Sequence, residues 1–104
     1  MLQFGILGPL EVRSGEALVD VGRPKQRAVL AALLIEANRV VAVDSLVERL
    51  WGDDAPARAV DSLQVYISGL RRALEPGRAA GTASTVLVTR APGYVLCVEA
   101  GALD

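Results

Sequence analysis

One uninterrupted stretch, residues 58–75, constrains the fold more than any other part of the chain. Its large apolar residues recur at helical spacing, so one face of an amphipathic helix must be buried. They are Leu63, Ile67, Leu70 and Leu74, with Val60 and Tyr66 at the edges of the stripe. The opposite face carries short or cationic side chains: Arg58, Asp61, Ser62, Val65, Ser68, Gly69 and Arg72. Such a face lets the helix approach another surface closely, either the major groove of DNA or a second protein domain.

The charge of the chain is uneven along its length. At 104 residues the chain fits one domain, and its formal net charge of −1 gives no global positive field. Residues 58–90, however, hold five arginines against only Asp61 and Glu75. Ten of the eleven cationic residues are arginine, whose planar fork suits phosphate and guanine. The basic side of the domain therefore begins at the amphipathic helix.

Several classes of function are disfavoured by what the sequence lacks. It contains no histidine, one cysteine, no Gly-rich phosphate loop opening a helix, and no paired carboxylates on a helical face. We therefore expect no enzyme, no metal, no cofactor and no small-molecule substrate. The unpartnered Cys97 indicates a reducing compartment, and the longest apolar run, Ala28–Ile35, is too short to cross a membrane. The sequence predicts a cytoplasmic protein with no membrane partner.

The rest of the chain divides into short strands and three helices. Apolar runs separated by Gly, Pro and Ser predict an antiparallel sheet over residues 2–21. A helix over 24–37 begins at Pro24 and ends before Asn38, which suits a left-handed position. A second helix, 44–51, is capped by Asp44. The third, 56–75, is opened by Asp54 with Pro56 in its first turn, which makes a helix-turn-helix.

A hairpin follows the third helix. The Gly/Ala/Ser/Thr-rich segment 78–84 is expected to be the least ordered internal stretch. Two β-rich runs within 85–98 flank Ala91-Pro92-Gly93, which has the residue types of a type II turn. Arg90 lies at its tip, in the position of a wing. The fold class predicted for residues 1–104 is α+β, a winged helix-turn-helix in a single domain.

Seven blocks of sequence, in order, resemble the N-terminal domain of the Streptomyces antibiotic regulatory protein family. They are Phe4–Val12, Pro24–Ala28, Asn38–Val41, Leu50–Asp53, Leu63–Ser68, Leu70–Arg72 and Pro92–Tyr94. The resemblance covers the whole chain. It implies a winged helix-turn-helix of the OmpR/PhoB type, with an N-terminal antiparallel sheet, three helices and a C-terminal hairpin wing. It also implies that a helical activation domain follows residue 104.

The resemblance further implies a transcription activator of antibiotic or secondary-metabolite genes. Two copies would sit head to tail on direct repeats of double-stranded DNA near the promoter −35 region and recruit the RNA polymerase holoenzyme. The recognition helix would read the major groove and the wing would reach the minor groove. The turn formed by Asp53, Asp54, Ala55 and Pro56 would face polymerase. Where relatives commonly have arginine this chain has Gly69, a change expected to remove a phosphate contact or bring the backbone closer to DNA.

Individual roles in DNA binding follow from the helical face. Arg72 and Arg90 are assigned to backbone contacts, and Arg71, on the side of the helix, to phosphates at the groove edge. Base or phosphate contacts are assigned to Arg58, Ser62, Val65 and Ser68, with Val65 against a thymine methyl group. Asp61 is expected to orient an arginine, although a role in the first helical turn explains it equally well. The alternative function is a winged-helix module that docks this face on a protein partner without binding DNA.

Overall fold

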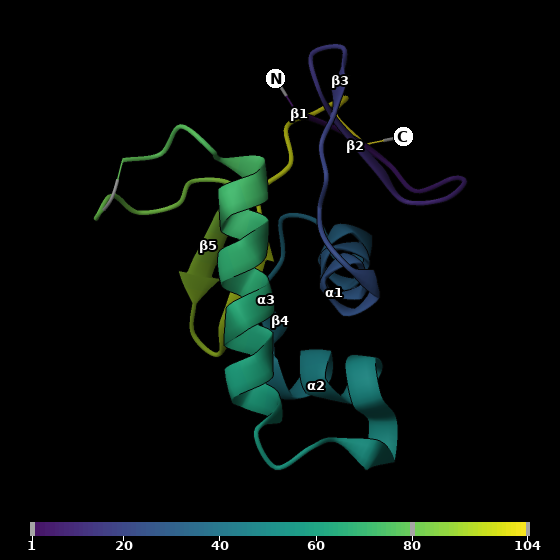
Figure 1. The fold of residues 1–104 in the computed structure, drawn as a ribbon, viewed down its shortest axis with the longest axis vertical. Coiled ribbons are helices and arrows are strands. Elements are labelled where there is room, and N and C mark those ends of the chain that lie inside the picture. Colours follow the sequence, from purple (N-terminus) through teal and green to yellow (C-terminus); the bar gives the residue numbers. More distant parts are fainter. Residues whose placement is uncertain (1, 80, 104) are drawn as a thin grey trace.

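The computed structural model describes residues 2–79 and 81–103 (Figure 1). Met1 and Asp104, at the ends of the predicted domain, and Ala80, in the predicted 78–84 loop, lie outside the described residues. The helices are α1 (Pro24–Ile35), α2 (Val43–Trp51) and α3 (Ala59–Leu74), with a 3-10 turn η1 (Gly52–Asp54). The strands are β1 (Leu2–Gly5), β2 (Glu11–Ser14), β3 (Ala17–Leu18), β4 (Val41–Ala42), β5 (Leu87–Arg90) and β6 (Gly93–Leu96).

The N-terminal strands form the antiparallel sheet that the sequence predicts. Its order is β1-β2-β3, with Phe4 opposite Val12 and Arg13 opposite Leu18. Phe4 and Val12 are buried and join the core under α1, whereas Leu18 on the edge strand is exposed. The sheet therefore closes one end of the core and, as Figure 1 shows, lies at the opposite end of the molecule from α2.

The three helices pack around a continuous apolar core. Helix α1 has Pro24 in its first turn and buries its middle, while α3 buries the stripe predicted from its sequence: Leu63, Ile67, Leu70 and Leu74. The helix was predicted to extend to residue 37, but α1 ends at Ile35. Asn38 has the expected left-handed conformation, with φ of 67°. Ile35 is exposed, so α1 is less completely enclosed than its apolar sequence suggests.

The segment before α3 differs from the prediction. Gly52 ends α2 as expected, but Gly52–Asp54 then form η1, and Ala55 is extended, with φ of −62° and ψ of 130°. A residue before proline is disfavoured in the helical region, so Asp54 cannot cap a helix that runs through Ala55. Helix α3 begins instead at Ala59, three residues after Pro56, whose carbonyl accepts a hydrogen bond from the Ala59 amide at 3.0 Å.

A second sheet joins the hairpin to the segment before α2. Its order is β4-β6-β5, with Val41 opposite Tyr94 and Ala42 opposite Gly93. A Cβ on Gly93 would overlap the Val41 carbonyl, so only glycine allows this pairing. Because the pairing runs up to Ala42, α2 starts at Val43, one residue before the predicted bound, and Asp44 lies in its first turn and is not its cap.

The turn of the hairpin is also different from the prediction. Arg90 pairs with Gly93, so the turn residues are Ala91 and Pro92, and the peptide bond between them is cis. Proline in cis at the second central position defines a type VI turn, not the type II turn expected from the sequence. The two strands occupy residues 87–90 and 93–96, within the predicted 85–98.

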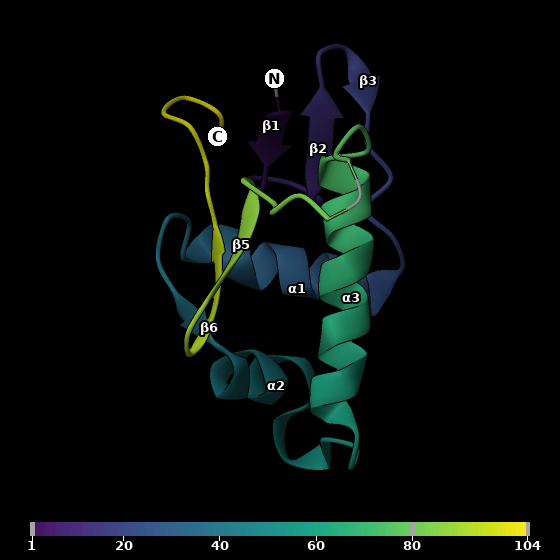
Figure 2. The ribbon, with the colours of Figure 1, turned by 90° about the vertical axis from the view of Figure 1, so that its left-hand side faces the viewer.

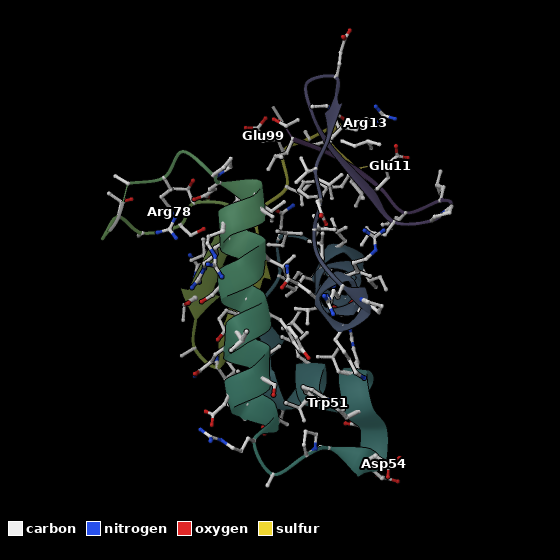
Figure 3. The ribbon with its side chains drawn as sticks, viewed as in Figure 1. Glu11, Arg13, Trp51, Asp54, Arg78 and Glu99 are labelled. Carbon is white, nitrogen blue, oxygen red and sulfur yellow. The ribbon has the colours of Figure 1, made fainter. Side chains whose placement is uncertain are left out.

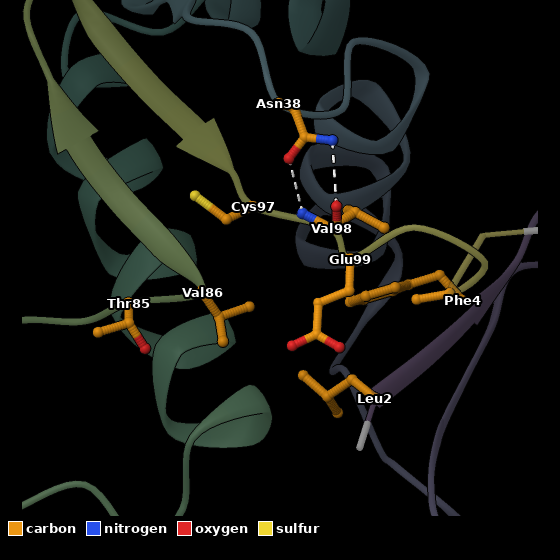
Figure 4. A pocket seen from close by; sticks show the side chains of 9 residues that line it. Leu2, Phe4, Asn38, Thr85, Val86, Cys97, Val98 and Glu99 are labelled. Atoms are coloured by element: carbon orange, nitrogen blue, oxygen red, sulfur yellow. Dashed lines mark hydrogen bonds between the residues drawn. The ribbon is translucent and has the colours of Figure 1, made fainter.

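The segment after β6 returns to the N-terminal sheet. The Asn38 side chain donates to the Val98 carbonyl at 3.1 Å and accepts from the Val98 amide at 2.8 Å (Figure 4). Further on, the Phe4 amide donates to the Ala102 carbonyl at 2.7 Å. Cys97 is a free, exposed cysteine just after β6. In the described part of the chain, no helix has both the length and the apolar character needed to cross a membrane.

Candidate nucleic-acid interface

The outward face of α3 is open to solvent along its whole length. Arg58, just before the helix, and Asp61, Val65, Ser68 and Arg72 within it are exposed, and Ser62 is half-buried. Val65 stands out because it is a bulky apolar residue with 65% of its surface exposed in the middle of a helix. Isolated exposed apolar residues are common, but this one is flanked by small polar and cationic groups. The predicted residues of this stripe therefore share one accessible surface.

Asp61 and Arg58 form an ion pair at the start of this surface. The Arg58 Nε donates to Asp61 Oδ2 at 2.9 Å, and the two side chains are 85% and 58% exposed. An ion pair this exposed adds little stability. The contact matches an acid that orients an arginine, and Asp61 also lies in the first turn of α3, so both roles predicted for it fit its position.

Gly69 lies on a different side of the helix from the one predicted. It is half-buried and faces α1, where a Cβ would overlap the side-chain amide of Gln26. That amide donates from Nε2 to the Val21 carbonyl at 3.0 Å. The outward assignment of Gly69 was therefore wrong, because at about 100° per residue it sits on the flank that packs against α1. The absence of a side chain at Gly69 leaves room for Gln26 between α1 and α3.

Arg71 ties the recognition helix to the hairpin. Its Nε donates to the Leu87 carbonyl at 2.9 Å and its Nη2 donates to Thr89 Oγ1 at 2.7 Å. The guanidinium carbon also lies 5.9 Å from the centre of the Tyr94 ring. Figure 1 shows β5 beside α3, and Figure 2 shows that the strand is tilted relative to the helix. Arg71 thus fixes the position of the wing relative to the helix.

Arg72 and Arg90 have free head groups. Both are exposed, and among residues 2–79 and 81–103 neither side chain has a hydrogen-bond or ion-pair partner. Arg72 points out from the last turns of α3, and Arg90 is the last residue of β5 before the wing turn. Either head group can therefore bind an anion without first breaking an internal contact.

An aromatic contact sets the position of α2 against α3. The rings of Trp51 and Tyr66 stack with centroids 6.5 Å apart and an interplanar angle of 29°. Lys25 of α1 covers the same indole, with Nζ 5.3 Å from the ring centroid, and donates to the Leu50 carbonyl at 2.5 Å. Since Lys25 is held in this way, its ammonium group supports the helix-turn-helix rather than extending from the surface. Figure 3 shows Trp51 between the helices.

The residues expected to face polymerase lie in the exposed segment just before α3. Asp53, Asp54, Ala55 and Pro56 are all exposed. Asp53 and Asp54 belong to η1, which projects at the end of the molecule beyond α2, as Asp54 does in Figure 3. A protein could contact this corner while α3 is covered by another ligand.

Sequence reasoning missed Glu75, which organises the connection from α3 to the wing. Its Oε1 accepts from the Val86 amide at 2.6 Å and the Thr85 amide at 2.9 Å, and Ser84 Oγ lies 3.2 Å away. Partial burial raises the pKa of the Glu75 carboxyl, but these hydrogen bonds outweigh that effect and lower the pKa overall. Its partners lie across a loop, so no local sequence pattern marks it.

Comparisons with known proteins agree with this geometry. The family model described as "Transcriptional regulatory protein, C terminal" matches residues 21–96. The transcriptional regulatory protein MoaR1 of Mycobacterium tuberculosis is 46% identical over 98 residues, covering 93% of this chain and 30% of MoaR1. The regulatory protein AfsR of Streptomyces coelicolor is 42% identical over 105 residues, covering 99% of this chain and 10% of AfsR.

A solved structure shows the same fold. Mycobacterium tuberculosis EmbR, in complex with a low affinity phosphopeptide, superimposes with a TM-score of 0.89 and 42% identity, over 99% of this chain and 27% of EmbR. The chain therefore spans less than a third of each of these relatives, all of which are named as regulatory proteins. With its α+β winged-helix fold, the chain belongs to the family of transcriptional regulatory proteins that share this domain, among the regulators of the Streptomyces antibiotic regulatory protein type.

Proposed function

We propose that this domain binds double-stranded DNA with α3 in the major groove. The observation that carries the proposal is the outward stripe beside the wing, formed by exposed Arg58, Val65, Ser68 and Arg72 and half-buried Ser62. The major groove is wide enough for one helix, and small side chains let the helix backbone lie deep within it. Membership of a family of transcriptional regulators supports the same ligand.

Each side chain then has a role that suits its chemistry. Val65 packs against a thymine methyl group, while Ser62 and Ser68 donate to base edges or phosphates. Arg58, directed by Asp61, reaches a base or a phosphate at the entry of the helix. Arg72 contacts the backbone beside the C-terminal half of the helix. Arg90 contacts the backbone or the minor groove from the wing.

We further propose that the protein activates transcription from paired sites. Two copies would lie head to tail on direct repeats near the promoter −35 region, and Asp53, Asp54, Ala55 and Pro56 would contact the RNA polymerase holoenzyme. The exposure of this corner, which precedes the start of the α3 stripe, supports contact with a second partner. The similarity to AfsR and the resemblance to antibiotic regulators support target genes in antibiotic or secondary-metabolite biosynthesis.

Selection of bound sites from a random duplex pool, followed by titration against salt, tests the proposal. A recovered direct repeat would give both the sequence preference and the number of copies bound. Arg72→Ala should weaken binding to every sequence and reduce the slope of log affinity against log salt by about one. Arg13→Ala, on the N-terminal sheet, is the matched control and should leave the slope unchanged. Equal slopes for wild type and Arg72→Ala would remove Arg72 from the interface.

The formal net charge of −1 favours a second candidate, a module that docks α3 on a protein. That function predicts no preference for any duplex over a scrambled one. It also predicts weak dependence of binding on salt, because few counterions are released. Recovery of a duplex motif with a steep salt slope would exclude it.

A further inference from the structure

A depression lined by arginines lies at the C-terminal end of α3. Ser68, Arg71 and Arg72 of the helix line it together with Arg78, from the loop that leads to the wing. A second depression shares Arg71 and Arg78 and continues to Thr89 of β5. Ser68 and Arg72 also belong to the outward stripe of α3, so the depression opens onto the proposed DNA-binding surface. Figure 3 shows Arg78 beside the upper part of α3.

Two of the three guanidinium groups are held in place before any ligand arrives. Arg71 is bonded to Leu87 and Thr89, as described above. Arg78 donates from Nη1 to the Thr82 carbonyl, and its Nε lies 3.4 Å from Glu75 Oε2. Fixed donors lose little side-chain entropy when they bind an anion. Because Thr89 Oγ1 accepts from Arg71, its own hydrogen remains available to an oxygen ligand.

The charges in this region favour an anion. The Glu75 carboxylate faces the loop amides and is only 13% exposed, so it does not point into solvent beside Arg72. The C-terminal end of a helix carries about −0.5 elementary charge, so the three arginines with Glu75 leave a net charge of roughly +1.5. A tetrahedral oxyanion with several acceptor oxygens would relieve the repulsion between the guanidinium groups and satisfy their free donors.

We infer that this depression binds one backbone phosphodiester of the duplex beside the groove that α3 enters. The inference rests on the proposed function and deepens it. It adds Arg78 to the interface as a direct phosphate contact, next to Arg71, whose bonds to the hairpin hold it in place. It also gives the loop between α3 and the wing a role: by holding one phosphate, the loop sets the position of α3 along the duplex.

A scan with neutral methylphosphonate links tests the inference on a duplex recovered by the selection. Each backbone phosphate is neutralised in turn, and affinity is measured by fluorescence anisotropy for wild type, Arg78→Ala and Arg13→Ala. For wild type and Arg13→Ala, one position beside the α3 groove should weaken binding about tenfold, the loss expected for one charge-assisted contact. For Arg78→Ala, neutralising that same position should cause a clearly smaller loss, because only Arg71 and Arg72 still face the phosphate.

The pattern of the scan separates a lost contact from a disturbed loop. A variant with a misplaced loop binds every duplex more weakly but keeps the wild-type response at each position. Such an unchanged response in Arg78→Ala, with duplex binding intact, overturns the inference and leaves the proposed function standing. Failure of wild type to bind any duplex overturns both. The same three proteins are also titrated with a phosphopeptide. If wild type and Arg13→Ala bind it and Arg78→Ala does not, while the duplex scan is unchanged, the depression belongs to a phosphorylated protein and the inference is overturned.

Discussion

Replacing Glu75 by alanine should destabilise the domain by removing the acceptor that holds the start of the wing. Its Oε1 receives the Val86 amide at 2.6 Å and the Thr85 amide at 2.9 Å. Each hydrogen bond to a charged group contributes about 1.5 kcal/mol at the low end of its range, so Glu75→Ala should lose about 3 kcal/mol. For a domain of this size, that corresponds to a fall of about 12 °C in Tm.

Thermal and urea denaturation, followed by circular dichroism, measure this loss. Glu48→Ala is the matched control, since Glu48 is an exposed glutamate of α2 whose carboxylate has no partner within the described residues. It should change stability by less than about 0.5 kcal/mol. Glu75→Gln keeps an acceptor oxygen but loses the charge, and should fall between wild type and Glu75→Ala.

The pH dependence follows from the lowered pKa of Glu75. Protonation is harder in the folded state than in the unfolded chain, so the charged carboxylate contributes its full stability above the ordinary value of 4.5. That contribution is lost as pH falls below 4.5 and through the folded-state pKa. The stability difference between wild type and Glu75→Ala should therefore shrink on acidification. A difference that stays constant from neutral pH down to about pH 3 would refute the assignment to a charged acceptor.

Two further substitutions test the contacts that hold the second sheet and the C-terminal segment. Gly93→Ala should lower the free energy of unfolding, measured in urea, by about 2–3 kcal/mol, because the new Cβ meets the Val41 carbonyl. Gly77 faces open space, so Gly77→Ala should be nearly neutral. Similar losses for both variants would contradict the packing argument. Asn38→Ala should lower the free energy of unfolding by about 2 kcal/mol, because it removes both side-chain bonds to Val98 and places alanine in a left-handed conformation. Asn38→Gly should recover only the part of this loss that comes from the left-handed backbone. In both Asn38 variants the Val98 amide should exchange its hydrogen faster, and unchanged exchange would show that the side chain does not hold this segment.

The features that could be predicted from the sequence are those with strong local periodicity. The buried stripe of α3, the three N-terminal strands and the hairpin follow from spacing and turn residues alone. The outward positions of Ser62, Val65, Ser68 and Arg72 follow from the same helical period that buries Leu63 and Ile67. In a regular helix, the period that identifies the buried face also identifies the outward face, so this part of the candidate site could be predicted together with the fold.

The features that were missed depend on contacts between distant residues. The start of α2 was misjudged because Ala42 pairs with Gly93, and the turn type because Arg90 pairs with Gly93. Arg71 looked free on a helical wheel, but its partners lie on β5. Two errors did not depend on distant contacts: the extended preference of Ala55 before proline and the inward flank of Gly69 were both available from the sequence.

The direct join between β4 and α2 has a mechanical consequence. Ala42 is both the last residue of β4 and the residue that precedes the first turn of α2, so no spacer lies between the wing sheet and the second helix. The wing sheet and the helix-turn-helix are therefore joined without a linker that would let them move independently. If α3 and the wing contact DNA as proposed, a duplex whose grooves do not match their separation has to bend or twist to fit, so the flexibility of the DNA contributes to the choice of site.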